Sequence, residues 1–308
     1  MRFLCLVNPV AGGHAGKLLL EQLQRICTLH YPESRVLEMD PAGLESQLAG
    51  ADRFDCVVAA GGDGTVSRII RKARAGSAKI AVFPLGTGDD LARELGVYHQ
   101  SRQLELEDWL RWCGAAPVRE LDVWSLQAAS PGGREVRFCN YLSLGFDAAV
   151  VSLFHRWRLT APVLFSLGGK WANRAGYALA GLACLPAAGL ESLEIRAAAQ
   201  LPVMTKDLRS LLFTNIRSCM GLGRSNLQSD PADGQLEALL IGSVLNYAGM
   251  LLPRLPLPAA SLVGSSAGWE IRLSVPVDLQ ADGEPLGALE SGRYRIESCA
   301  KVKLLATR

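Results

Sequence analysis

Three glycine-rich turns hold the residues of this sequence whose types and spacing are best suited to chemistry. Each follows an apolar run, and they read Asn8-Pro9-Val10-Ala11-Gly12, Gly61-Gly62-Asp63-Gly64-Thr65 and Pro84-Leu85-Gly86-Thr87-Gly88. Glycine lets a backbone approach a phosphate group closely, and Asp63 adds a carboxylate that can orient Mg²⁺ or water. Thr65 is a residue type that opens helices. The turns therefore predict a phosphate cradle made of backbone N–H groups and helix N-termini.

A simpler interpretation of the second turn is an ordinary tight turn with a capping threonine. We favour phosphate binding, because turn chemistry alone rarely places three glycines around one acid. Two better-known phosphate motifs do not fit. The segment from Gly12 to Lys17 is one residue short of a P-loop, and Leu18 stands where Ser or Thr would hold Mg²⁺. No G-x-G-x-x-G motif is complete.

The apolar runs before the three turns predict the strands that position them. Arg2–Val7, Asp55–Ala60 and Lys79–Phe83 are mostly apolar, and a helical pattern follows each turn. A strand, a turn and a helix repeated three times predict a parallel sheet with crossover helices. In such a sheet the carboxyl ends of the strands share one edge, where ligands bind.

The pattern changes near Val118, so we predict two domains, 1–118 and 119–308. Strand-like stretches separated by turn residues predict an antiparallel, mostly β second domain. These stretches are Arg119–Gln127, Glu135–Leu144, Glu191–Ala197, Leu208–Ile216, Leu236–Val244 and Trp269–Leu279, with helical patterns at Ala148–Arg158 and Lys170–Leu185. The last strand-like run, Arg293–Leu305, either stays in this domain or returns to the first.

Composition narrows the class of protein. The chain has 308 residues, 49% of them hydrophobic, and a formal net charge of +2, so there is no general argument for a nucleic-acid partner. The eight cysteines are dispersed without a C-x-x-C pair, which indicates reduced thiols in an intracellular protein. The N-terminal apolar run leads directly into a glycine turn and is interpreted as a strand, not a signal peptide. We therefore expect a cytoplasmic protein.

Several motifs together resemble one protein family. The three turns occur in the order and spacing of the diacylglycerol kinase catalytic-domain family, which includes bacterial lipid kinases and the sphingosine and ceramide kinases. The matching segments are Asn8-Pro9-x-x-Gly12, Gly61–Thr65, Pro84–Arg93, Gly145–Ala148, Asp230–Gly234 and Asp282-Gly283-Glu284. NAD kinases and phosphofructokinases share the second turn. The third turn combined with a distant Asp-Gly-Glu is more specific.

The resemblance implies a fold and an activity. It implies a three-layer α/β nucleotide-binding domain followed by a β-sandwich-like domain that takes the lipid and a metal ion. The activity would be an Mg²⁺-dependent lipid kinase that moves the γ-phosphate of ATP to a lipid hydroxyl, with a diacylglycerol-like acceptor.

The resemblance also implies roles for particular residues. Asp63 would organise the catalytic Mg²⁺, and Glu284 would be the general base. Asp233, with backbone carbonyls near Asp230 and Gln235, would hold a structural Mg²⁺ linked through water to Asp122 and Asp63. ATP would be held by Asn8, Pro9, Gly12, Gly61, Gly62, Asp63, Gly64, Thr65, Ser67, Gly86, Thr87 and Asp90.

Each distal motif also has a simpler interpretation. Asp282-Gly283 between alternating residues is a hairpin turn by itself, and Asp233-Gly234 is a common turn. Asp122 in a strand is equally compatible with a solvent-facing carboxylate. Their occurrence together with the three turns supports the functional interpretation.

The sequence departs from the family pattern at three places. Asp89 stands where the family has Asn. Ser67-Arg68 stands where the family has a pair such as Asn-Glu, and Glu38 or a neighbour stands where it has Thr. An added carboxylate near phosphate weakens binding unless a cation such as Arg68 compensates. These departures keep a non-catalytic nucleotide- or lipid-binding protein open as an alternative. A sphingoid or ceramide-type kinase also stays open, and a NAD kinase fits less well.

One stretch suggests contact with a membrane. Basic and aromatic residues are interleaved in Phe154-His155-Arg156-Trp157-Arg158 and again at Lys170, Trp171, Arg174 and Tyr177. Such a surface suits anionic headgroups, although two packed helices with solvated charges explain it slightly better. The expected partners are ATP and a lipid at a membrane surface, reached by peripheral association with the inner face, and a homodimer is one expectation for the assembly.

Overall fold

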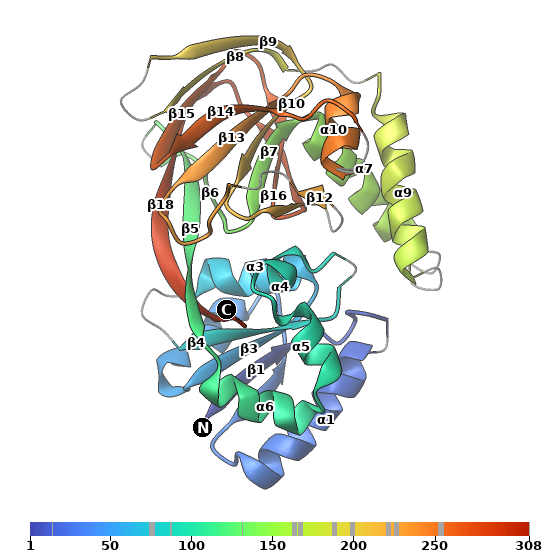
Figure 1. Cartoon of the computed structure of the whole chain (residues 1–308), viewed down its shortest axis with the longest axis vertical. Coiled ribbons are helices and arrows are strands. Elements are labelled where there is room, and N and C mark those ends of the chain that lie inside the picture. The colour runs from blue at the N-terminus through green and yellow to red at the C-terminus, as the bar shows by residue number, and fades with distance from the viewer. Residues whose placement is uncertain are drawn as a thin grey trace. The chain divides into compact units, whose positions relative to one another are not determined.

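The computed structural model divides the chain into two compact units, Met1–Val123 with Ala300–Arg308, and Trp124–Cys299 (Figure 1). We call them the first and the second unit. Strands β5 (Val118–Ala128) and β18 (Gly292–Leu305) contribute residues to both. The structure describes residues 1–13, 15–73, 78–86, 88–130, 132–161, 165, 169–186, 190–197, 201–219, 223–224, 228–251 and 256–307.

A parallel sheet forms the centre of the first unit. Its strands lie in the order β2–β1–β3–β4, and the end of β18 lies parallel to β4, with Leu304 opposite Ile80. Their bounds are β1 (Phe3–Val7), β2 (Arg35–Glu38), β3 (Cys56–Gly61) and β4 (Lys79–Pro84). This is the predicted parallel sheet, and its C-terminal strand settles that the last run of the sequence ends in the first unit.

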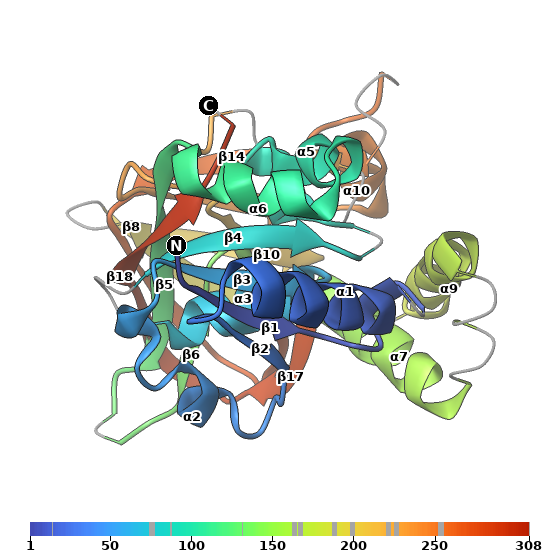
Figure 2. The same cartoon turned by 90° about the horizontal axis from the view of Figure 1, so that it is seen from below.

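Helices complete the first unit as three layers. Apolar side chains of α1 and α6 pack on one face of the sheet, and α3 lies on the opposite side (Figure 1). Seen from below, α1 lies across the front of β1 and β3 (Figure 2). The helices are α1 (Ala15–His30), α2 (Leu44–Leu48), α3 (Asp63–Lys72), α4 (Asp90–Glu94), α5 (Val97–Gln103) and α6 (Leu106–Ala115).

Two large sheets and the short β11–β12 pair make up the described strands of the second unit. In one, β18 pairs with β15 and β5, β5 with β6, and β8 with β15 and β9. The other is antiparallel in the order β14–β13–β10–β7–β16–β17. The remaining bounds are β6 (Glu135–Phe138), β7 (Tyr141–Gly145), β8 (Leu190–Ala197), β9 (Val203–Leu208), β10 (Ser210–Thr214), β11 (Ser218–Cys219), β12 (Gly223–Arg224), β13 (Leu236–Ile241), β14 (Ser261–Ser266), β15 (Gly268–Leu273), β16 (Val277–Ala281) and β17 (Glu284–Leu289).

The main core of the second unit lies between these sheets. Phe213 of one sheet meets Trp269 of the other, with ring centroids 5.9 Å apart. The Trp269 indole N–H donates to the Leu236 carbonyl at 2.8 Å, so this large buried ring keeps its polar atom satisfied. The predicted sandwich-like arrangement is therefore confirmed.

Helices cover the outer face of the antiparallel sheet. Its strands β7, β10 and β13 send side chains into a second apolar cluster with α7 (Phe146–Thr160), α9 (Gly169–Ala183) and α10 (Val244–Leu251) (Figure 1). The central strands β7, β10 and β13 of this sheet are almost entirely buried, because the sandwich core covers one face and these helices the other.

Two predicted strands are each divided in the structure. Glu135–Leu144 becomes β6 and β7, because the backbone N–H groups of Cys139 and Asn140 donate to the Asp282 carboxylate instead of a strand ladder. Trp269–Leu279 becomes β15 and β16, separated by a segment with Pro276, which has no N–H to give to a ladder.

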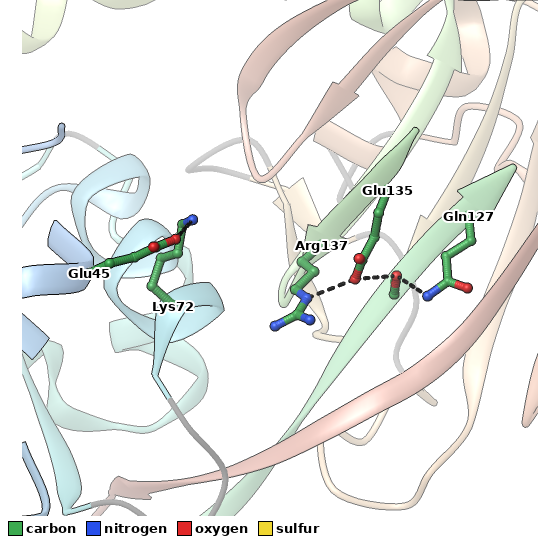
Figure 3. Close-up of polar contacts among 6 residues, drawn as sticks. Glu45, Lys72, Gln127, Glu135 and Arg137 are labelled. Atoms are coloured by element: carbon green, nitrogen blue, oxygen red, sulfur yellow. Dashed lines mark hydrogen bonds and ion pairs between the residues drawn. The ribbon is translucent and has the colours of Figure 1, made fainter. Parts of the chain in front are cut away.

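Polar contacts fasten edges of each unit (Figure 3). In the first unit, Lys72 at the end of α3 forms an ion pair with Glu45 of α2. In the second unit, Glu135 accepts from Arg137 Nε at 2.9 Å and from Ser125 Oγ at 3.1 Å, and Ser125 accepts from Gln127 at 3.2 Å. Of these contacts, the one between Ser125 and Glu135 joins β5 to β6.

Candidate active site

The three glycine-rich turns meet at one edge of the first-unit sheet. They follow β1, β3 and β4, which are parallel neighbours, so their carboxyl ends lie together. Backbone bonds extend past the strand ends: Asn8 N–H donates to the Ala60 carbonyl at 2.9 Å, and Leu85 N–H to the Gly61 carbonyl at 2.8 Å. The turns therefore start from fixed positions relative to one another.

A side-chain hydrogen bond joins the first turn to the second. Asn8 Nδ2 donates to the hydroxyl oxygen of Thr65 at 2.8 Å, while Asn8 Oδ1 accepts from Val10 N–H at 3.2 Å. The prediction that Thr65 opens the helix is wrong: α3 begins at Asp63, with Gly62 before it, so Thr65 lies in its first turn. Its hydroxyl serves the contact with Asn8 instead.

Close glycine contacts join the other turns. A Cβ on Gly86 would come within 2.8 Å of Gly62 Cα, and a Cβ on Gly12 within 2.9 Å of the Leu85 carbonyl oxygen. Gly12 also has a φ of +62°, which other residues rarely adopt. Only glycine lets three backbones approach this closely, and the result is a compact, backbone-lined edge of the kind that receives phosphate.

Asp63 lies where the second and third turns meet. The backbone N–H groups of Asp89 and Asp90 donate to its carboxylate. Loss of hydration, and next the negative charges of Asp90 and Asp89, raise the pKa of Asp63 to about 8. Three carboxylates thus gather at this edge, and a bound cation would relieve their mutual repulsion.

The structure gives Asp89 a local role that the sequence analysis missed. Asp89 has a left-handed backbone with φ +54°, and its Oδ1 accepts from Gly86 N–H at 2.9 Å. Asn and Asp are the residues that adopt this conformation most readily and both carry an acceptor oxygen. The substitution for the family's Asn is therefore compatible with the turn. The available sequence signal was an Asp directly after the glycine-rich turn, a residue type that tolerates a left-handed backbone.

The remaining predicted nucleotide residues of the first unit are distributed along these turns. Gly61 ends β3, Gly64 lies in the first turn of α3, and Pro9 is half-buried in the first turn of the chain. Ser67 and Asp90 are both buried, and Thr87 lies outside the described residues. Of the other departures, Arg68 is half-buried in α3 and Glu38 is exposed at the end of β2.

Glu284 is the first residue of β17 in the second unit. Asp282 and Gly283 form a two-residue turn between β16 and β17, with φ values of 52° and 79° and Ala281 opposite Glu284. This is the hairpin predicted as the simpler interpretation. Asp282 nevertheless does more than turn the chain, because its carboxylate is buried and accepts from the N–H groups of Cys139, Asn140 and Tyr141 at 3.2, 2.8 and 3.2 Å.

The predicted metal residues belong to different units. Asp122 is fully buried in the first unit, with Lys301 Nζ 3.3 Å from its Oδ1. In the second unit, Asp230 Oδ1 accepts from Ala232 N–H at 3.0 Å and Asp233 Oδ1 from Gln235 N–H at 2.8 Å. These are local turn contacts.

Within the described part of the chain, no group of three or more His, Cys, Asp or Glu side chains is arranged to hold a metal ion. At the edge formed by the three turns, the residues present fit an Mg²⁺ that would be bound by one or two carboxylates together with phosphate and water, which is how proteins usually hold it.

Two aromatic side chains of the predicted membrane stretch, Phe154 and Tyr177, take part in packing within the second unit. The Phe154 ring lies 5.2 Å from Tyr177 and 5.5 Å from Phe165, between α7 and α9. Arg156 and Arg158 are exposed on α7, as are Leu159 and, on α9, Leu179 and Leu182. The side chains of Lys170, Trp171 and Arg174 lie outside the described residues.

Among the helices that the structure describes, none has the length and apolarity needed to cross a bilayer.

Comparison with known proteins gives two family matches. Residues 2–116 match the diacylglycerol kinase catalytic domain, and residues 137–285 match the diacylglycerol kinase accessory domain. Diacylglycerol kinase 2 of Arabidopsis thaliana is 27% identical over 320 residues, covering 92% of this chain and 43% of that kinase. The chain spans less than two thirds of the length of the first curated relatives that it matches.

Solved structures share the fold at low sequence identity. The crystal structure of a diacylglycerol kinase from Bacillus anthracis str. Sterne has a TM-score of 0.67 and 16% identity, covering 99% of this chain and 96% of that one. Yeast NADH kinase complexed with NADH has a TM-score of 0.51 and 13% identity, covering 100% of this chain and 84% of that one. The two-unit architecture is thus common to these proteins.

Proposed function

Because this chain belongs to the diacylglycerol kinase catalytic-domain family, we propose that it transfers the γ-phosphate of ATP to a hydroxyl group of a lipid, with Mg²⁺ as cofactor. The observation that carries this proposal is the edge where Gly12, Gly62 and Gly86 bring three turns together beside Asp63. A diacylglycerol-like lipid is the proposed acceptor.

The first unit binds ATP in this proposal. Backbone N–H groups of the three turns and the N-terminus of α3 receive the phosphates, and Asn8 and Thr65 keep two of the turns in register. When bound, Mg²⁺ supplies the positive charge that neutralises the transferring phosphoryl group. Asp63 is the carboxylate placed to orient it. Phosphoryl transfer needs positioning and charge neutralisation more than covalent chemistry, and these residues provide positioning.

The second unit binds the lipid and supplies the base. Glu284 is half-buried at the start of β17, next to a turn that is fixed by Asp282. As the lipid hydroxyl attacks, the Glu284 carboxylate accepts its proton. Asp233, with carbonyls near Asp230 and Gln235, would hold a structural Mg²⁺. Asp122 is paired with Lys301 within the first unit.

We propose that the lipid is met at a membrane surface by peripheral association with its cytoplasmic face. The surface of α7 and α9 carries both apolar and cationic groups. The apolar groups are the exposed side chains of Leu159, Leu179 and Leu182, and the cationic groups are those of Arg156 and Arg158. Such a surface suits anionic headgroups above an acyl layer.

Incubation with ATP, Mg²⁺ and a total lipid extract, followed by mass spectrometry, tests the activity. We expect one lipid class to gain a single phosphate, with diacylglycerol as the acceptor and no NADP formed from NAD. Phosphorylated sphingoid bases or ceramide would move the acceptor to the alternative class. NADP as the only product, or an Mg-ATP-induced rise in melting temperature without any phosphorylated lipid, would overturn the proposal.

A further inference from the structure

A buried hydrogen-bond network ends at the turn that carries Glu284. It comprises Ser143 of β7, Asp147 in the first turn of α7, and Gln280 of β16, which are 0%, 3% and 0% exposed. Ser143 Oγ donates to Asp147 Oδ2, and Gln280 Nε2 donates to Ser143 Oγ at 2.7 Å and to Asp147 Oδ2 at 3.1 Å. On the other side of the amide, Gln280 Oε1 accepts from Gly283 N–H at 2.9 Å.

The network permits only one orientation of the Gln280 amide. An ionised carboxylate only accepts hydrogen bonds, and the Ser143 hydroxyl uses its single proton on Asp147. Both neighbours on that side therefore need a donor, which is the amide NH₂. The amide oxygen is left facing Gly283, whose N–H needs an acceptor. If the amide were turned over, its oxygen would face the Ser143 and Asp147 oxygens and its NH₂ group would face the Gly283 N–H. These buried groups would then lack hydrogen-bond partners.

This orientation matters because of where the Gly283 N–H lies. In a two-residue hairpin turn the ladder bonds belong to the residues that flank the turn, here Ala281 and Glu284. The N–H of the second turn residue needs another acceptor, and Gln280 provides it. The Asp282 carboxylate holds the same turn from the other side, through the N–H groups of residues 139–141. The Asp282–Gly283 peptide, one residue before Glu284, is thus held both by the Gln280 amide oxygen and by the contacts of the Asp282 carboxylate.

We propose that Asp147 and Gln280 are positioning residues for Glu284: Asp147 orients the Gln280 amide, and that amide holds the turn from which Glu284 projects. This inference rests on the proposed lipid kinase activity, with Glu284 as the base. It assigns a task to the Gly145-Phe146-Asp147 motif, which the function above does not use. The contrasting role for this network is stability alone, as a set of buried polar groups that satisfy one another.

Kinetics of two variants distinguish the two roles. Gln280→Met keeps the length of the side chain and removes its acceptor, and Asp147→Ala removes the group that orients it. We expect each to lower kcat by roughly 10–100-fold, since small misplacement of a catalytic group has effects of this size. The KM for Mg-ATP should stay within about twofold, because the nucleotide residues belong to the other unit. Asp147→Asn keeps an oxygen that accepts from Ser143 and Gln280, and should retain most of the rate.

The Glu284→Gln background gives the decisive comparison. If Gln280 acts through Glu284, then Gln280→Met lowers the residual rate of Glu284→Gln little further, since residues that act as a unit are not additive. A role in stability alone predicts that the two losses multiply. Ser143→Ala removes one hydroxyl of the network and should show the same pattern with a smaller loss.

The matched control is Thr205→Val, which removes a buried hydroxyl that donates to the Leu193 carbonyl elsewhere in the second unit. Its kcat should be unchanged.

Amide hydrogen exchange tests the contact itself. The Gly283 amide should exchange at least about tenfold faster in Gln280→Met and Asp147→Ala than in the wild type and in Thr205→Val, because it loses its buried acceptor. Unchanged Gly283 exchange, multiplicative rate losses, or an unchanged kcat in an active protein would overturn this inference alone. A wild-type protein that phosphorylates no lipid would instead overturn the proposed function, a result that the product assay gives separately.

Discussion

The Asn8 side-chain amide donates a 2.8 Å hydrogen bond to the Thr65 hydroxyl, which joins two glycine-rich turns that lie 57 positions apart in the sequence. Thr65 lies in the first turn of α3, two residues after Asp63, so the contact connects the start of that helix to the end of β1. The contact adds a side-chain link to the backbone hydrogen bond between Asn8 and Ala60. The proposed ATP site therefore depends on a pair of residues that need not touch the nucleotide themselves.

The Asn8 and Thr65 pair should show coupling in ATP binding. We expect Asn8→Ala and Thr65→Val each to weaken Mg-ATP binding by about 3–10-fold, the worth of one hydrogen bond of about 1 kcal/mol. The double variant should be no weaker than the worse single variant, because either change removes the same contact. Calorimetric titration of the four proteins measures this. Fully additive losses would show that the two residues contribute separately.

Gly86→Ala should disturb the same edge by steric means. The added Cβ would lie 2.8 Å from Gly62 Cα and 2.6 Å from Asp89 Oδ1, so the second and third turns must separate. We expect a lower melting temperature and at least roughly tenfold weaker Mg-ATP binding, since overpacking commonly destabilises by 1–3 kcal/mol. Gly114→Ala in α6 is the control, because its Cβ would meet only Met1 Sδ at 3.5 Å. Equal behaviour of the two variants would contradict the proposed packing of the turns.

Glu284→Gln tests the proposed general base. The substitution keeps size and hydrogen-bonding capacity and removes the basic carboxylate, so lipid phosphorylation should fall by roughly 10²–10⁴-fold. Mg-ATP affinity and melting temperature should hardly change, since the turn residues Asp282 and Gly283 are intact. Glu290→Gln, at an exposed position nearby, should retain the wild-type rate. Loss of rate together with loss of stability would indicate a structural carboxylate, and retained turnover would remove Glu284 from the mechanism.

Asp147 should make stability depend on pH. Burial raises the pKa of Asp147 from 3.8 to about 6, against the lowering effect of hydrogen bonds from Ser143 and Gln280. The folded state then binds the proton more tightly than the unfolded state. The associated stability is complete below about pH 4 and is lost as pH rises through about 6. Relative to Asp147→Asn, the wild type should therefore lose up to about 3 kcal/mol between pH 4 and pH 7, from a shift of about two pKa units. Denaturant unfolding of both proteins at several pH values measures the difference, and a pH-independent difference would contradict it.

Charge reversal on α7 tests the proposed membrane contact. Changing Arg156 and Arg158 to Glu should weaken binding to vesicles that contain anionic lipid, and the effect should shrink as salt rises, because surface charges are screened over about 8–10 Å. Arg35→Glu, exposed on β2 in the other unit, is the control and should bind as the wild type does. Unchanged binding of the α7 variant at low salt would favour two packed helices with solvated charges. Phe154 and Tyr177, both half-buried, pack against each other between α7 and α9.

Much of the fold could be predicted because it depends on local pattern. Continuous apolar strands such as Cys56–Gly61, followed by glycine turns and helices, have one economical arrangement, a parallel sheet with crossover helices. That arrangement also brings Gly12, Gly61 and Gly86 to one edge. The Asp282-Gly283 hairpin was equally accessible, because few residue pairs adopt positive φ at two successive positions.

The sequence by itself thus determined the parallel sheet, the glycine edge and the hairpin before Glu284, since each follows from periodicity or from backbone conformations that few residue types adopt. Only the tertiary structure decided which distant groups meet. It paired Asn8 with Thr65, gave the Asp282 carboxylate to the N–H groups of residues 139–141, set Lys301 beside Asp122, and returned the end of β18 to β4 in the first unit. These contacts depend on packing between segments up to 224 residues apart in the chain, as Leu304 and Ile80 are. No local pattern records them, because a buried polar group accepts any partner of suitable chemistry that the fold brings to it.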